Sequence, residues 1–88
     1  MSKFTQGEWF IDQYGDIVDS KGDLIAELDY EDRSTEEYDA NSRAIKAVPE
    51  MYKALEELIP ILKSDNRLAI AYSIEKLLAR IDGTDTEA

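Results

Sequence analysis

Cysteine and histidine are both missing from this 88-residue sequence. Without cysteine the chain can form no disulfide, no thiolate metal site and no cysteine nucleophile. Without histidine it lacks the most common general base and the most common ligand of transition metals. A Gly-rich phosphate-binding loop is missing as well. We therefore expect no catalytic residues, no bound metal and no cofactor, and we expect that the protein is not an enzyme.

Long hydrophobic runs are also missing. No stretch approaches the roughly 18–20 apolar residues of a membrane span, and residues 1–6 lack the apolar core of a signal peptide. Apolar residues nevertheless make up 43% of the chain and charged residues 34%, which is the balance of a globular protein. We expect one cytoplasmic domain over residues 1–83, a frayed tail at 84–88, and no contact with membranes.

Acidic residues outnumber basic residues by 20 to 10, which gives a net charge of −10. Residues 1–44 contribute 12 acids and 4 bases, so most of the acidity lies in the first half. Such a chain repels nucleic acid and attracts basic proteins, or sites that normally hold nucleic acid. The densest run is a candidate partner-binding patch, formed by Asp29, Glu31, Asp32, Glu36 and Glu37. The alternative is a solvated link followed by the start of a helix.

The first third of the chain has the pattern of a three-stranded antiparallel meander. Short apolar runs at residues 8–12, 16–19 and 24–29 alternate with turns that carry glycine. The aspartates at these turns are dense enough for a calcium loop but lack its spacing, so we interpret them as turn residues. The buried face of this sheet is expected to contain Trp9, Ile11, Leu24, Ala26 and Leu28. We expect no internal repeat in the chain.

Aromatic side chains gather in the expected sheet region. Trp9 fits a position in the core. Phe10, Tyr14 and Tyr30 are candidates for an exposed surface, where an aromatic ring can anchor a protein interface or stack on a base. For Phe10 a core position is an equal alternative.

The rest of the chain has helical periodicity. Ser34 and Glu37 match a capping box at the start of a helix. An apolar seam follows with a seven-residue period, and Pro49 is expected to kink or break the helix. A last helix is expected over residues 66–81, ended by Gly83. The fold class is therefore α+β, with a small three-stranded antiparallel sheet followed by a helical hairpin.

The apolar seam is also a candidate oligomer interface. Its members are Tyr38, Ile45, Val48, Tyr52, Leu55, Ile59 and Leu62, and the polar Asn41 shares their spacing. A hairpin within one chain and a homodimer would both use such a seam. Pairing would stabilise a chain this small, so we expect a homodimer as one use of the seam. In the last helix the apolar positions are Ile70, Ile74, Leu77 and Ile81.

Residues 39–58 resemble a segment found in short bacteriophage and prophage proteins, whose pattern is roughly Ala-Asn-Ala-Arg-Leu-Ile-Ala-Ala-Ala-Pro-Glu-Met. In that family the segment follows a strand with an Ile-Ala pair, like residues 25–26, and precedes a helix that ends like residues 79–83. Lys46 stands where the family usually has alanine. The similarity covers residues 8–83. It implies a host-facing accessory role inside the bacterial cell, and it carries no catalytic residues over.

Three functions are open on this basis. The first is inhibition of a bacterial defence system, such as a CRISPR effector, by an acidic protein that occupies a basic nucleic-acid groove. The second is sequestration of a small nucleotide signal by an oligomer, with Arg43, Lys46, Lys53 and Arg67 as the cations. The third is a structural or regulatory role in the phage itself. The expected partner is a host protein or nucleoprotein complex, without direct binding of nucleic acid.

Overall fold

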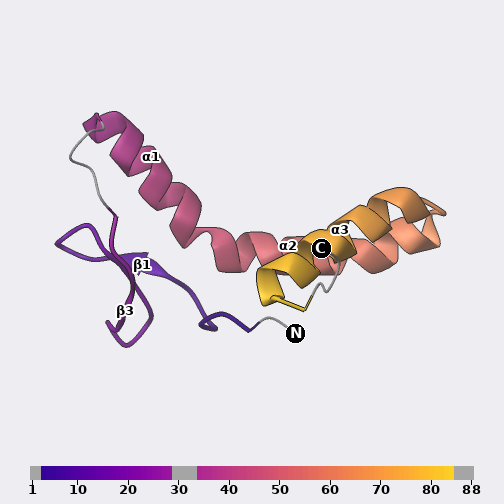
Figure 1. Ribbon diagram of the computed structural model, residues 1–88, viewed down its shortest axis with the longest axis horizontal. Helices are drawn as coiled ribbons and strands as arrows, with labels where there is room; N and C mark the ends of the chain where they lie inside the picture. The colour runs from indigo at the N-terminus through magenta and orange to yellow at the C-terminus, as the bar shows by residue number, and fades with distance from the viewer. Residues whose placement is uncertain (1–2, 29–33, 85–88) are drawn as a thin grey trace. The chain divides into compact units, whose positions relative to one another are not determined.

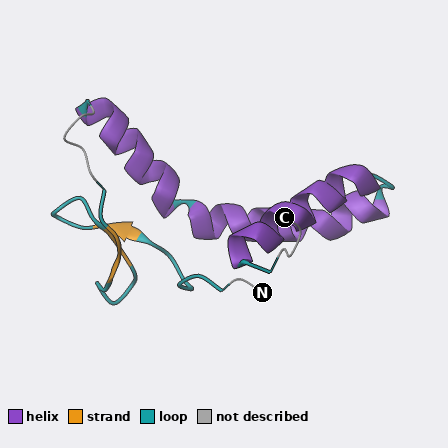
Figure 2. Ribbon diagram, viewed as in Figure 1, coloured by secondary structure: helices purple, strands orange, loops and turns teal. Residues whose placement is uncertain are grey.

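The computed structural model describes residues 3–28 and 34–84, which form three short strands followed by three helices (Figures 1 and 2). The strands are β1 (Phe10–Ile11), β2 (Ile17–Val18) and β3 (Leu24–Ala26). The helices are α1 (Thr35–Lys46), α2 (Val48–Ser64) and α3 (Leu68–Asp82). The predicted α+β class and element order are confirmed, although each strand is shorter than predicted.

The chain divides into two compact units. The sheet unit is Thr5–Glu50, which holds the three strands and α1. The hairpin unit combines Met1–Phe4 with Met51–Ala88 and holds most of α2 and all of α3. The expectation of a single domain over residues 1–83 stays a prediction, and most of the expected tail lies outside the described residues.

The sheet has the order β1-β2-β3 with antiparallel neighbours. Ile17 and Val18 of the central strand are both buried, so both faces of β2 are covered, since successive side chains of a strand point to opposite faces. Trp9 is also buried, as predicted. Ile11 and Leu24 are 39% and 55% exposed, so their predicted place on the buried face is wrong. The pairing register shifts within β2, and strands this short do not sustain the alternation on which that prediction depended.

The turn between β1 and β2 is built around one aspartate. The Asp12 Oδ1 accepts hydrogen bonds of 2.9 Å from the backbone amides of Tyr14 and Asp16. The Asp12 amide donates to the Asp16 carbonyl, and the Gly15 amide donates to the Asp12 carbonyl, each at 3.0 Å. Gly15 has φ +82°, a conformation that glycine adopts without steric cost. A single carboxylate therefore organises the whole turn.

The turn between β2 and β3 repeats these contacts seven residues later. The Asp19 Oδ1 accepts hydrogen bonds of 2.9 Å from the amides of Lys21 and Asp23. The Asp19 amide donates to the Asp23 carbonyl, and the Gly22 amide donates to the Asp19 carbonyl. Gly22 has φ +87°. The two turns are thus copies of one structure.

This repetition corrects the expectation that the chain has no internal repeat. The shared sequence is apolar–Asp–x–x–Gly–Asp–apolar, and it begins at Ile11 and again at Val18. The expectation was wrong because the unit is only seven residues long and its unconstrained positions differ. The interpretation of the aspartates as turn residues is confirmed.

Helix α1 begins as the sequence predicts. The Ser34 side chain accepts a hydrogen bond of 3.1 Å from the Glu37 amide and so caps the first turn. One turn into the helix, the Tyr38 hydroxyl donates to the Gly15 carbonyl at 2.7 Å. Helix α1 also contacts β1 and β2. The capped helix is therefore attached to the sheet and to its first turn.

The break between α1 and α2 confirms the predicted effect of Pro49. Ala47 ends α1, and its amide donates to the Ile45 carbonyl. Pro49 is then the second residue of α2, where its missing N–H costs no intrahelical hydrogen bond. Pro60 lies inside α2 and removes one such bond there.

Helices α2 and α3 form an antiparallel hairpin within the hairpin unit (Figure 1). Asn66 has φ +59°, a left-handed conformation that delays the start of α3 to Leu68, two residues later than predicted. Gly83 has φ +73° and ends α3 as predicted, with its amide donating to the last turn. The core of this unit contains Tyr52, Ala71 and Leu78.

Candidate functional site

The candidate acidic patch is described only in part. Glu36 and Glu37 lie exposed in the first turn of α1, where negative charge interacts favourably with the helix dipole. Asp29, Glu31 and Asp32 lie outside the described residues. The partner-binding role of the five residues stays a prediction.

The acidity is concentrated in one unit of the chain. The sheet unit carries 13 acids and 4 bases, a net charge of −9. The hairpin unit carries 7 acids and 6 bases, a net charge of −1. In the described part of the sheet unit, exposed acids are found before the sheet, in the second turn, after β3, on α1 and at the start of α2; they are Glu8, Asp23, Glu27, Glu36, Glu37, Asp39 and Glu50. A positively charged partner would therefore be attracted to the sheet unit.

Two of the three candidate aromatic anchors are exposed. Tyr14 is 74% exposed and Phe10 is 41% exposed, whereas Tyr30 lies outside the described residues. Tyr14 sits in the first turn between Asp12 and Asp16. An aromatic ring beside carboxylates suits a guanidinium group, which stacks on the ring and pairs with the acids. Binding of a partner by these aromatics stays a prediction.

The candidate oligomer seam crosses both units, and the chain itself uses two of its members. Tyr38 bonds to the first turn of the sheet unit. Tyr52 is buried in the hairpin unit, where its ring lies nearly perpendicular to the ring of Phe4 with ring centres 5.1 Å apart. The other members are half-buried; they are Ile45, Val48, Leu55, Ile59 and Leu62. Their use between copies of the chain stays a prediction.

A hydrogen-bonded pair that the sequence did not reveal joins α2 to the end of α3. The Tyr52 hydroxyl donates to the Asp82 Oδ2 at 2.5 Å, and the Asp82 Oδ1 accepts from the Lys3 amide at 3.0 Å. The bond to Asp82 raises the pKa of Tyr52 to about 12, and the same bond holds the pKa of Asp82 below its usual range. At neutral pH Tyr52 is therefore protonated and Asp82 is ionised. The pair links α2 to α3, and the pKa values of both groups are too far from neutral for proton transfer between them.

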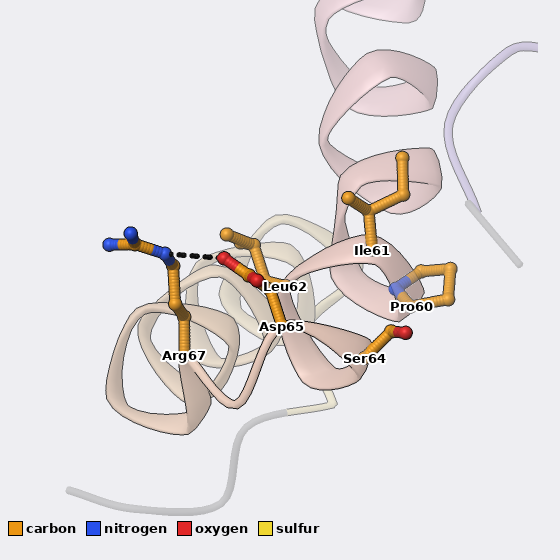
Figure 3. Close-up of a pocket in the computed structure, with 6 residues that line it drawn as sticks. All are labelled: Pro60, Ile61, Leu62, Ser64, Asp65 and Arg67. Carbon is orange, nitrogen blue, oxygen red and sulfur yellow. Dashed lines mark hydrogen bonds and ion pairs between the residues drawn. The ribbon is translucent and has the colours of Figure 1, made fainter.

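A shallow hollow of about 540 Å³ lies at the turn between α2 and α3 (Figure 3). Its lining consists of Pro60, Ile61, Leu62, Ser64, Asp65 and Arg67. The Arg67 Nε pairs with the Asp65 Oδ2 at 2.8 Å, so the cation of the hollow already faces a carboxylate. This arrangement does not favour a phosphate-bearing ligand.

The four cations proposed for a nucleotide trap do not form one cluster within either unit. Arg43 and Lys46 lie in the last turn of α1. Lys53 and Arg67 belong to the hairpin unit, but Lys53 lies near the start of α2 and Arg67 follows its end. At 1.5 Å per residue, α2 separates those two positions by about 16 Å. The hairpin unit alone therefore offers no paired cations from this set.

Within residues 3–28 and 34–84, no group of three or more acids is arranged to hold a metal ion. Across the same residues, no helix is long and apolar enough to span a membrane.

A family model described as Salmonella phage P22 protein Y8K6 matches residues 1–83. The chain belongs to this phage protein family. No curated protein and no solved structure was found to match it. Family membership confirms the predicted phage origin and the accessory class of protein, whereas the motif at residues 39–58 stays a prediction.

The surface offers carboxylates and an exposed tyrosine in the sheet unit and an apolar hairpin in the other unit.

Proposed function

We propose that this phage accessory protein inhibits a bacterial defence system by binding a host protein through its sheet unit. The target is a host protein with a basic groove that normally holds nucleic acid, such as a CRISPR effector. The observation that carries the proposal is the segregation of charge, with −9 in the sheet unit against −1 in the hairpin unit. The site of action is then the cytoplasm of the infected bacterium.

The physical basis is competition for phosphate-binding cations. A nucleic-acid groove holds arginines and lysines that bind phosphates at close spacing. Carboxylates of the sheet unit would replace those phosphates, and displaced counterions would favour binding in the same way. The repeated turns contribute by holding two aspartates each at fixed backbone positions, which limits the entropy lost when the acids bind. Tyr14 adds a ring on which an arginine can stack.

The first experiment identifies the target. The protein would be tagged, captured from a nuclease-treated lysate of the bacterial host and analysed by native mass spectrometry. The proposal expects that a basic host protein is recovered together with the tagged protein. It also expects that the tagged protein competes with nucleic acid for binding to this host protein. A complex that is indifferent to salt between 50 and 200 mM would contradict the electrostatic mechanism, because phosphate-like contacts weaken steeply over about this range.

Charge reversal then tests which surface binds. Glu36→Lys with Glu37→Lys changes two exposed acids of the sheet unit. Glu56→Lys with Glu57→Lys changes two exposed acids of α2 and alters the net charge by the same amount, so it is the matched control. The proposal expects at least a tenfold loss of affinity in the first variant and less than a threefold loss in the control. Equal losses would mean that overall charge, and not the sheet unit, governs binding.

A further inference from the structure

Both helices of the hairpin carry a row of apolar residues with the spacing i, i+4, i+7, i+11. The row on α2 is Met51, Leu55, Leu58 and Leu62, and the row on α3 is Ile70, Ile74, Leu77 and Ile81. Five of the eight side chains remain between 38% and 49% exposed; they are Met51, Leu58, Ile70, Leu77 and Ile81. We call these eight residues the hairpin face.

The polar contacts between the helices show that the two rows lie on the same side of the hairpin. Tyr52 of α2 bonds to Asp82 of α3, and Lys63 of α2 pairs with Glu75 of α3 at 3.0 Å. All four residues therefore lie on one side. The line along which α2 touches α3 divides each helix into two sides. At 100° per residue, the polar pairs lie on one of these sides and the apolar row lies on the other. One side of the hairpin is fastened by polar pairs, and the other is a continuous apolar surface.

The hairpin face carries no charged residue, in a chain of which 34% is charged. On α2 the acids and lysines occupy the other half of the helix; they are Glu50, Lys53, Glu56, Glu57 and Lys63. On α3 they likewise lie outside the row; they are Glu75, Lys76, Arg80 and Asp82. An exposed apolar surface that no charged residue interrupts is typical of an interface.

We propose that the hairpin face binds the hairpin face of a second copy of this chain. The contact would be isologous, with each face serving as the partner of the other. Two antiparallel helix pairs with this spacing can pack their rows against each other as in a four-helix bundle. The residues of the proposed interface differ from the predicted seam, with which they share Leu55 and Leu62.

The area of the face favours a second copy as the occupant, and the charge of the hairpin unit opposes it only weakly. Two chains of net charge −10 repel each other, but the hairpin unit contributes only −1 and its face contributes nothing. The exposed part of the face is on the order of 500 Å² per copy, so that two copies would bury about 1,000 Å², near the lower limit for a specific interface. The dimer is therefore expected to be reversible, with a dissociation constant in the micromolar range. Dimerisation goes beyond the proposed function, since a monomer can bind a basic target as well.

Sedimentation velocity from 5 to 500 µM tests the proposal. The protein is expected to pass from monomer to dimer over this range. Leu58→Lys with Leu77→Lys places a charge on each row and is expected to raise the dissociation constant at least about 100-fold, because a buried unpaired charge is costly. The matched control is Ile61→Lys with Leu68→Lys, which changes exposed apolar residues of the same helices outside the face. Its dissociation constant is expected to stay within threefold.

If the protein sediments as a monomer at every concentration, the proposal is wrong. The partner that covers the face would then be a different protein. Equal weakening by the control pair would overturn it too, because association would then not depend on the hairpin face. Circular dichroism at 222 nm establishes that each variant is folded.

Crosslinking keeps the proposal testable if the lysine variants do not fold. The chain has no cysteine, so single cysteines give a clean background. Ile70→Cys and Leu77→Cys, treated with a short bis-maleimide, are expected to form covalent dimers at least tenfold faster than Tyr72→Cys, which is exposed on another side of α3. A dimer that crosslinks no faster through the face than through Tyr72→Cys would refute this interface.

Discussion

Replacing Gly15 by alanine tests how the first turn and α1 are held together. Gly15 and Gly22 occupy the same position in the two copies of the turn, and both have positive φ. A Cβ at Gly22 would meet no atom within 4 Å, whereas a Cβ at Gly15 would overlap the Tyr38 hydroxyl. Gly22→Ala therefore measures the backbone cost alone, and Gly15→Ala measures the backbone cost and the contact with Tyr38.

The magnitudes follow from these two contributions. A left-handed conformation costs an alanine about 1–2 kcal/mol, and the less flexible unfolded chain returns about 0.5–1 kcal/mol. Gly22→Ala is therefore expected to lower the free energy of unfolding by about 1 kcal/mol. In Gly15→Ala the overlapping Tyr38 must also give up its hydrogen bond to the Gly15 carbonyl, which adds about 1 kcal/mol, and its displacement adds a similar amount. The expected total is about 3 kcal/mol.

Urea unfolding monitored by Trp9 fluorescence measures both variants. Trp9 is the single tryptophan of the chain and is buried in the sheet unit, so its emission reports on the unit that is perturbed. In a Tyr38→Phe background both the hydrogen bond and the overlapping oxygen are gone, so the cost of Gly15→Ala is expected to fall by about 2 kcal/mol, to that of Gly22→Ala. Equal costs for Gly15→Ala and Gly22→Ala, or a cost that is unchanged by Tyr38→Phe, would refute the reasoning.

Three further predictions concern single contacts. Asp19→Ala removes the acceptor of two amides in the second turn, so we expect the free energy of unfolding measured by Trp9 fluorescence to fall by about 1–2 kcal/mol, while Asp19→Asn keeps an acceptor oxygen and is expected to recover part of the loss. Tyr52→Phe removes the bond that raises the pKa of Tyr52 to about 12 and lowers that of Asp82. That bond stabilises the fold above the usual range of an aspartate pKa, and it is lost as the pH falls through the lowered pKa of Asp82. It also stabilises the fold below the ordinary tyrosine pKa of about 10 and is lost as the pH rises through about 12. The melting temperatures of wild type and Tyr52→Phe should therefore differ most between about pH 5 and 9 and should converge in acid, and a difference that is constant with pH would contradict the pairing. Lys63→Met breaks an exposed ion pair with Glu75 and is expected to cost less than about 0.5 kcal/mol by thermal unfolding, since both side chains are half exposed.

Local chemistry made part of this fold predictable. Ser34 caps α1 through the Glu37 amide, and Gly83 ends α3 with positive φ, because each depends on residues within one helical turn. Pro49 breaks the helix for the same kind of reason, since the missing N–H acts at its own position. The three strands were likewise marked by their turns. Signals of this kind need no knowledge of distant residues.

Burial was less predictable because it depends on which segments meet. Ile11 and Leu24 fit the alternation of a strand, yet both are exposed in a sheet of two- and three-residue strands with an irregular register. On α3 the smaller Ala71 enters the core while the larger Ile70 stays half exposed. The periodicity showed that α3 has an apolar side, but the line of contact is set by the approach of α2. The sequence therefore predicted which side of α3 is apolar, but not which residues of that side are buried in the core and which remain exposed.

The candidate site divides along similar lines. The net charge and its uneven distribution were visible in the sequence, because they require only counting. The Tyr52–Asp82 pair was not visible, since its members are 30 positions apart and no sequence pattern links them. The repeated turn could have been found by comparing residues 11–17 with residues 18–24. Its signal was present but short.

The repeated turn also makes the sheet modular. Each seven-residue copy contains one reversal of the chain with a strand residue at either end, and its turn hydrogen bonds are all internal to the copy. A further copy, inserted in frame, would therefore contain all the hydrogen-bonding groups of its own turn and would lengthen the meander by one strand. Related chains of this kind could gain or lose strands in steps of seven residues, so that a duplication of 21 nucleotides is enough to widen the sheet and to add two more carboxylates to it.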